Sequence, residues 1–120
     1  MVGEVTGTIC ADAAGWRDWL SRHHGSSTEV WLVIARKGTA RPTSLSQAQA
    51  LEEALCQGWI DSQARSRDDS TYLQRFTPRR PKSPWSRRNV GIVERLQSEG
   101  RMCPAGLAEV ERAKADGRFF

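Results

Sequence analysis

Hydrophobic residues recur at helical spacing in residues 12–24. Aromatic and aliphatic side chains fall at i, i+3 and i+4 intervals there, which indicates a helix with one apolar face. Asp12 is a favourable N-cap, and Gly25 is placed to end the helix. We therefore predict an N-terminal helix that packs in the core through one face. That face consists of Ala13, Trp16, Trp19, Leu20 and His23.

Residues 44–57 carry the clearest helical pattern of the chain. Ser44 and Gln47 have the spacing of a capping box, and Gly58 follows as a C-terminal stop. We expect the adjacent Glu52 and Glu53 to face solvent. The apolar positions of this predicted helix are Leu45, Ala48, Leu51, Ala54 and Leu55.

Three stretches have the character of β-strands. Residues 29–36 are largely a run of β-branched, aromatic and aliphatic residues, which predicts a central strand covered on both faces. Residues 59–67 and 71–77 alternate in character and flank turn-forming residues at 68–70, so they predict a β-hairpin. Residues 1–10 show no period, and we expect them either to be disordered or to add a short edge strand.

Two further helices complete the predicted fold. Ser86, or the preceding Ser83-Pro84 pair, begins one that ends before Gly100, and Pro104 begins another that ends before Gly117. The order of elements predicts an α+β fold: a small, mostly antiparallel sheet of three to four strands packed by about four helices. We expect residues 1–120 to form one domain.

The composition is that of a soluble globular protein. The chain has 120 residues, of which 38% are hydrophobic and 27% charged, so it is long enough to form its own core. No segment approaches the roughly 18 apolar residues of a membrane span, and no secretory signal is visible at the N-terminus, so we expect a cytoplasmic protein without a membrane partner. Cys10, Cys56 and Cys103 form no metal or disulfide motif, and we expect three reduced thiols. We predict no cofactor and no metal site, while the oligomeric state stays open.

The positive charge of the chain is local. The net charge is +4, yet residues 75–101 hold eight basic and two acidic residues, a net +6, which leaves −2 for the remainder. A local basic patch indicates an anionic partner: phosphate, nucleic acid, an acidic small molecule or an acidic protein surface. A solvated basic face without a partner is the alternative.

Residues 75–89 combine six basic residues, three prolines and two aromatic residues, without an acidic residue. The prolines prevent a regular helix or central strand, so this stretch is predicted to be a rigid connector. A hairpin brings its two ends together, which places Asp61 near Arg75 or Thr77, and a helix starting at Ser86 turns its N–H groups toward the connector. Guanidinium groups bind carboxylate and phosphate in bidentate fashion. We therefore predict a ligand or anion site made of Trp59, Asp61, Arg75, Thr77, Arg79, Arg80, Trp85, Ser86 and Asn89.

Two blocks of sequence stand out: Glu53-Ala54-Leu55-Cys56-x-Gly58-Trp59-Ile60-Asp61 and Arg75-Phe76-Thr77-Pro78-Arg79-Arg80-Pro81-x-Ser83-x-Trp85-Ser86-x-x-Asn89. They resemble the YdeI/OmpD-associated (OmdA) family, and shorter matches cover nearly the whole chain. The resemblance implies a bacterial, cytoplasmic α+β protein linked to bacteriocin protection, antibiotic resistance or stress response. It also implies a longer chain, because members of the family usually continue into a basic, helical tail.

The patch and the resemblance together predict a binding protein. We expect it to bind a small anionic or aromatic molecule, or a peptide, and to protect by sequestering that ligand in a pocket lined by Trp and Arg. A nucleic-acid-binding module using residues 75–101 is one alternative, although no helix-turn-helix or RNP-type motif supports it. An enzyme of unknown reaction is another; no catalytic residue is assigned, because no nucleophile elbow, P-loop, dinucleotide or metalloprotease motif occurs.

A purely structural role competes with each of these functions. Asp61 can pair with Arg75 or Arg79 to hold the connector, the tryptophans can be core residues, and Ser86 or Asn89 can cap a helix.

Overall fold

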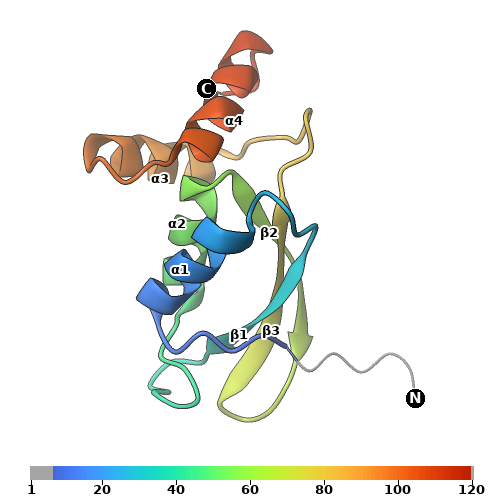
Figure 1. Cartoon of the computed structure of the whole chain (residues 1–120), viewed down its shortest axis with the longest axis vertical. Helices are drawn as coiled ribbons and strands as arrows, with labels where there is room; N and C mark the ends of the chain where they lie inside the picture. The colour runs from blue at the N-terminus through green and yellow to red at the C-terminus, as the bar shows by residue number, and fades with distance from the viewer. Residues whose placement is uncertain (1–6, 120) are drawn as a thin grey trace.

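The structure is a computed structural model that describes residues 7–119. Within this range, four helices and three strands follow one another in the predicted order, and the predicted α+β fold is confirmed (Figure 1). The expectation for residues 1–6 lies outside the described residues. In chain order the elements are α1 (Ala13–His23), β1 (Val30–Ala35), α2 (Gln47–Cys56), β2 (Trp59–Ser66), β3 (Thr71–Pro78), α3 (Arg87–Ser98) and α4 (Pro104–Ala115).

The strands form one antiparallel sheet in the order β1-β3-β2. The central strand is therefore β3, and the prediction of a central strand at residues 29–36 is wrong. The apolar run has a different cause: β1 is covered on both faces. Leu32 faces the helices in the first core cluster, while Val33 is fully buried on the opposite face.

The segment before α1 pairs with the free edge of β1. Thr8 forms a parallel bridge with Leu32, and its N–H donates to the carbonyl oxygen of Trp31 at 2.7 Å, so within the described residues the expected edge strand is reduced to a single bridge. Gly7 has a φ of +85°, and a Cβ added there would lie 2.5 Å from a methyl group of Leu73. Glycine is therefore required where this segment passes the side chains of Val33 and Leu73.

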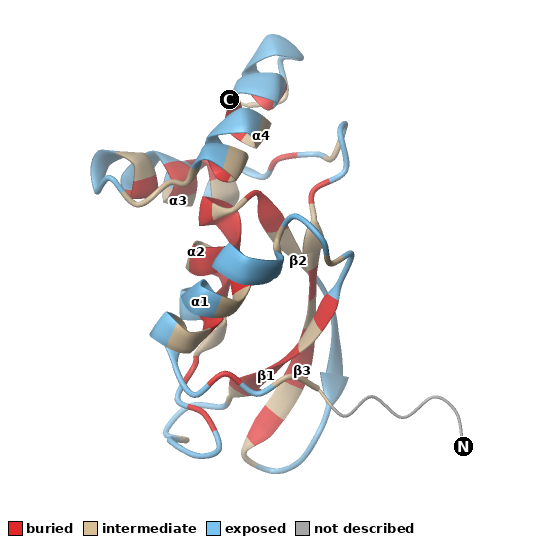
Figure 2. Cartoon of the chain, viewed as in Figure 1, coloured by how far each residue is buried: buried red, intermediate tan, exposed pale blue. Residues whose placement is uncertain are grey.

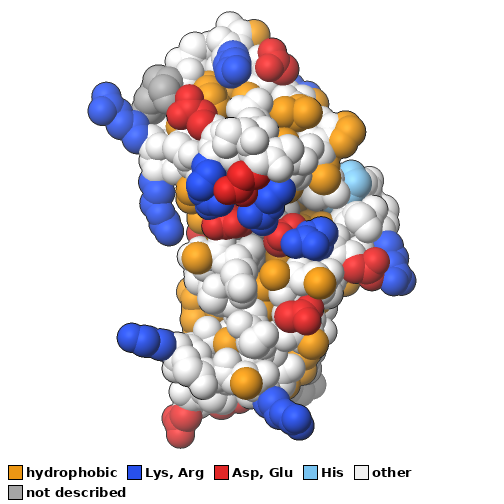
Figure 3. All heavy atoms as spheres, turned by 90° about the vertical axis from the view of Figure 1, so that its left-hand side faces the viewer, with side chains coloured by type: hydrophobic (Ala, Val, Ile, Leu, Met, Phe, Trp, Pro, Cys, Tyr) orange, Lys and Arg blue, Asp and Glu red, His pale blue; other side chains and the backbone are white. Residues whose placement is uncertain are grey.

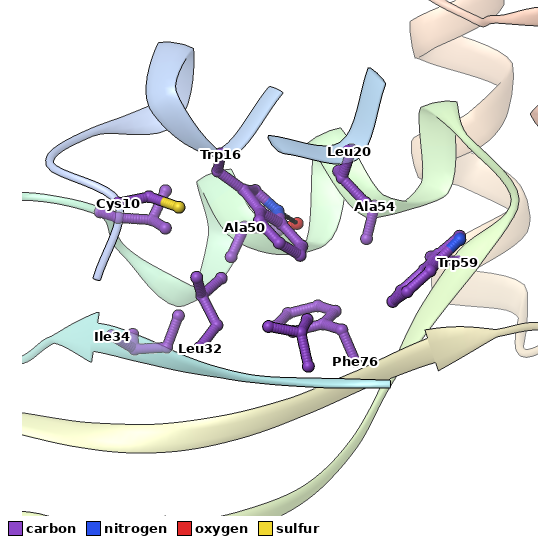
Figure 4. Close-up of a cluster of buried hydrophobic side chains, with 11 residues drawn as sticks. Cys10, Trp16, Leu20, Leu32, Ile34, Ala50, Ala54, Trp59 and Phe76 are labelled. Atoms are coloured by element: carbon purple, nitrogen blue, oxygen red, sulfur yellow. Dashed lines mark hydrogen bonds between the residues drawn. The ribbon is translucent and has the colours of Figure 1, made fainter. Parts of the chain in front are cut away.

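Helices α1 and α2 pack side by side on one face of the sheet (Figure 1), and Figure 2 shows their sheet-facing sides buried. Trp16 joins the two helices, because its Nε1–H donates to the carbonyl oxygen of Ala50 at 3.0 Å (Figure 4). The ring of Phe76 lies 5.4 Å from that of Trp16, so the sheet and both helices meet at one point. The cluster consists of Cys10, Trp16, Leu20, Val30, Leu32, Ile34, Leu45, Ala50, Ala54, Trp59 and Phe76.

A second core cluster joins α2 to α3 and α4, beyond the end of the sheet (Figure 1). The approach of α4 to α2 is close: a Cβ added to Gly106 would lie 2.3 Å from the carbonyl oxygen of Cys56. Only glycine fits this contact. The cluster consists of Leu51, Leu55, Cys56, Trp85, Val90, Val93, Leu96, Val110 and Ala113.

The start of α2 differs from the prediction by two residues. The capping box is formed by Ser46 and Gln49, and the predicted pair of Ser44 and Gln47 is wrong. Residues 43–45 stay outside the helix because they are bound elsewhere: the N–H of Ala35 donates to the carbonyl oxygen of Leu45 at 2.8 Å.

Candidate functional site

The hairpin places Asp61 and Arg75 on opposite faces of the sheet. Asp61 is in register with Phe76 and therefore shares the helix-covered face, where it accepts a 3.1 Å hydrogen bond from Gln47. Arg75 projects from the other face and donates from Nε to Glu29 at 2.5 Å. Asp61 and Arg75 lie close along the strands, as predicted, but their expected pairing is wrong. Asp61 is opposite Phe76, and the side chains of Arg75 and Phe76 point to opposite faces because they are consecutive in β3.

The two predicted site tryptophans lie in different core clusters. Trp59 is 1% exposed and belongs to the cluster under α1 and α2, where Trp19 meets it edge-on at 5.9 Å. Trp85 belongs to the cluster formed with α3 and α4. Trp59 is therefore a core residue. Of the predicted site, the part at the connector around Trp85 remains the candidate.

Within the connector, Arg79 is the central side chain. Its N–H extends the hairpin by donating to the carbonyl oxygen of Gly58 at 3.0 Å. Its guanidinium carbon lies 3.7 Å from the centre of the Trp85 ring, a cation–π contact. Its Nη1 donates to Ser83 Oγ at 2.8 Å and to the carbonyl oxygen of Pro84 at 3.2 Å. Arg79 therefore folds residues 79–85 around itself.

One edge of the Arg79 guanidinium has no hydrogen-bond partner. Nε and Nη2 are both buried, and neither donates to an acceptor in the described part of the chain. The residue is only 7% exposed. Burial is the main cause that lowers the pKa of Arg79 to about 10; the charge of Glu109 opposes the lowering, Arg118 adds to it, and Asp61 opposes it. A buried cation with two unsatisfied donors is costly, and such groups are normally paired.

The residues after α4 press against the connector. Arg118 donates from Nη1 to the carbonyl oxygen of Ser83 at 2.6 Å and from Nη2 to that of Pro81 at 2.8 Å. Phe119 meets Trp85 edge-on at 5.1 Å. Nε of Arg118 is also buried without a partner, so two guanidinium groups with spare donors lie at this connector.

The start of α3 closes the site on one side. Ser86 is the N-cap, and its Oγ accepts from the N–H of Asn89 at 3.1 Å, which confirms the start predicted at Ser86. Arg80 and Ser86 are exposed, and Asn89 and Thr77 are half-buried. Arg80 is therefore a cation beside the site and not part of its buried centre.

Much of the predicted basic patch is neutralised internally. Arg95 and Arg101 bind Glu52 and Glu99, and Figure 3 shows basic and acidic side chains interleaved near the middle of one face. Glu53, expected to face solvent, is 4% exposed. It accepts two hydrogen bonds from Arg17, at 3.0 and 2.8 Å, and a 3.0 Å hydrogen bond from Arg101. The expectation that Glu53 faces solvent is wrong. The local sequence does not reveal these partners, because Arg17 and Arg101 are 36 and 48 positions away from Glu53.

Sequence reasoning missed Arg118 and Phe119. They lie more than thirty positions after the connector residues that they contact, and α4 returns them to it. The aromatic pair at 119–120 next to a basic residue was the one available signal.

Two general features bear on the class of site. No helix among residues 7–119 has the length and apolar character needed to cross a bilayer. The same residues contain no group of three or more His, Cys, Asp or Glu side chains placed to hold a metal ion.

Comparison with known proteins assigns a family but no activity. The family model of a domain of unknown function, DUF8412, matches residues 8–109, which include the hairpin, the connector and α3. No curated protein and no solved structure gives a significant match. Because the family model covers most of the chain, the protein belongs to the DUF8412 family.

Proposed function

We propose that this protein binds a small anionic ligand, a carboxylate or phosphate carried on an aromatic or apolar body, at the connector around Arg79 and Trp85. The observation that carries the proposal is the unpartnered Nε–Nη2 edge of the buried Arg79. This edge has the fork geometry that binds two oxygens of one anion. Arg17 uses the same two atoms to bind the carboxylate of Glu53.

A bound anion relieves the cost of burying Arg79. It supplies two acceptors to donors that lack them and a negative charge beside a guanidinium whose pKa is lowered by burial. The spare Nε of Arg118 lies at the same connector. An anion therefore gains more here than at an exposed arginine, where water already satisfies every donor.

The aromatic residues favour a ligand with an apolar body. Trp85 and Phe119 form an edge-on pair at the site, and the prolines of the connector limit its flexibility. Since Nε and Nη2 are shielded from solvent, binding requires side chains over the guanidinium to move.

Nucleic-acid binding has less support. Arg75, Arg95 and Arg101 are engaged with glutamates, and Arg79 is buried, so half of the basic residues between 75 and 101 are not offered to a polyanion. We propose no catalytic step, because guanidinium and indole groups are neither nucleophiles nor bases at neutral pH.

Sequestration of such a ligand is the proposed link to the antimicrobial or stress protection that the resemblance to the YdeI/OmdA family implies. Survival of a sensitive bacterium expressing the protein tests this link. Arg79→Met should abolish protection and Arg80→Met should retain it. Equal survival with both variants would remove the connector from the protective role.

The binding proposal is tested with benzoate and benzamide, which have nearly the same shape and differ in charge. We expect benzoate, and phenyl phosphate as a second anion, to raise the Tm of the wild-type protein, and benzamide to leave it unchanged. Arg79→Met should lose the response while Arg80→Met keeps it. The proposal fails if neither anion raises the Tm, or if benzamide acts as benzoate does.

A further inference from the structure

We propose that Cys56 and Cys103 are a redox-responsive pair that a peroxide closes into a disulfide. Cys56 is the last residue of α2, and Cys103 is the N-cap residue of α4. Both are free thiols in the structure. Neither residue takes part in the proposed ligand site, so the two proposals stand independently.

The backbone holds the two cysteines next to each other. The N–H of Cys103 donates to the carbonyl oxygen of Cys56 at 3.0 Å. With standard peptide dimensions, this hydrogen bond places the two Cα atoms about 5 to 6 Å apart, inside the range of about 4.4 to 6.8 Å seen for disulfides. The close packing of Gly106 on the carbonyl group of Cys56 fixes this approach.

Both side chains line one cavity. Its volume is about 330 Å³, and its other lining residues are Arg17, Leu20, Glu53, Gln57 and Arg101. A molecule as small as hydrogen peroxide fits this space. Cys103 is half-buried and Cys56 is 3% exposed, so Cys103 is the thiol that an oxidant meets first. Burial also raises the pKa of Cys56 to about 12, which keeps this thiol protonated and leaves Cys103 as the one that reacts with a peroxide.

The reaction balances with hydrogen peroxide as the oxidant. The Cys103 thiolate attacks one peroxide oxygen, the O–O bond breaks, and the departing hydroxide takes a proton to become water, leaving a sulfenic acid. The sulfur of Cys56 then attacks the sulfur of Cys103, the S–O bond breaks, and the Cys56 proton leaves with the hydroxide as a second water. Two thiols lose two electrons, and one peroxide becomes two waters.

The disulfide would join the end of α2 to the start of α4. It would close a loop over residues 57–102, which contains the hairpin, the connector and α3. Because a cross-link restricts the unfolded chain, the oxidised protein should be more stable than the reduced protein. The pair therefore gives the fold a way to tighten under oxidative conditions.

The experiment treats the full chain with hydrogen peroxide, blocks remaining thiols with iodoacetamide under denaturing conditions, and maps the peptides by mass spectrometry. We expect a linked peptide pair containing Cys56 and Cys103, alkylation of Cys10 alone, and a higher Tm that dithiothreitol reverses. Cys10→Ser is the matched control and should still form the disulfide. Cys56→Ser and Cys103→Ser should each abolish it.

Three outcomes overturn the proposal. One is that Cys103 proceeds to sulfinic acid while Cys56 stays reduced. Another is that the oxidised protein is linked through Cys10 or between two chains. The third is that all three thiols remain alkylatable at peroxide concentrations that oxidise a free cysteine peptide.

Discussion

Arg79 lies over the face of Trp85, with its guanidinium carbon 3.7 Å from the centre of the indole ring. One edge of the guanidinium holds the connector through Ser83 and Pro84, while the opposite edge has no partner. One edge of the guanidinium group therefore has a structural role, and the hydrogen-bond donors of the other edge are unsatisfied. The unsatisfied edge is the proposed anion site.

The burial of Arg79 predicts an unusual alkaline behaviour. Because its pKa falls to about 10 on folding, the unfolded chain binds more protons than the folded chain between that value and the ordinary arginine value. The unfolding free energy of the wild-type protein should therefore rise relative to that of Arg79→Met by about 1 kcal/mol between pH 9 and 11. Urea unfolding of both proteins across this range measures the difference. A constant or falling difference would contradict the lowered pKa.

Two helical glycines predict opposite effects of the same substitution. Gly106→Ala places a methyl group against the carbonyl group of Cys56 and should destabilise the protein by at least about 2 kcal/mol. Gly91, in α3, has room for a side chain, because an added Cβ would meet nothing within 4 Å besides its chain neighbours and the backbone of its own helix, so Gly91→Ala should stabilise by about 0.5 to 1 kcal/mol. Urea midpoints with matched slopes test both. If Gly106→Ala is neutral, the packing of α4 on α2 is looser than described.

Glu53 predicts a large effect from removing one charge. Glu53→Gln would remove the buried carboxylate that Arg17 and Arg101 share, and should cost about 2 kcal/mol of unfolding free energy through weakened charge-assisted hydrogen bonds. Glu52→Gln is the control on the same helix. Glu52 is more exposed, so its loss should cost less than about 1 kcal/mol. Equal losses for the two variants, measured by urea unfolding, would show that burial of Glu53 contributes nothing.

The N-cap of α3 predicts a local effect next to the site. Ser86→Ala removes the acceptor for the N–H of Asn89 and should cost about 1 kcal/mol. Ser86→Asp should restore that stability, because a carboxylate accepts the same hydrogen bond and favours the helix N-terminus. Thermal unfolding of the three proteins tests the cap, and a fully stable Ser86→Ala would exclude it.

Local sequence signals predicted most of the helices and strands. Asp12, Pro104, Gly100 and Gly117 bound helices as expected, because caps and stops depend on near neighbours. The start of α2 was misplaced because residues 43–45 are held by β1, a contact that no local pattern records. The central strand was misplaced for a similar reason. The N-terminal segment pairs with β1, so β1 has the continuous apolar sequence that is typical of a strand between two others, although it lies at the edge of the three-stranded sheet.

The candidate site was predicted in part. The connector motif singled out Arg79 and Trp85, which do meet. The pairing of Asp61 with Arg75 failed on strand alternation, and Trp59 proved to be a core residue. Arg118 could not be foreseen, because α4 brings it to the connector from far along the chain.

The most direct measurement follows the Nε–H signal of Arg79 in a nitrogen-15 NMR spectrum, assigned by its loss in Arg79→Met. The account predicts that benzoate moves this signal strongly and saturably, since the proton enters a new charge-assisted hydrogen bond, and that benzamide does not. An Arg79 signal that stays in place at saturating benzoate, or that moves equally with benzamide, would contradict the account.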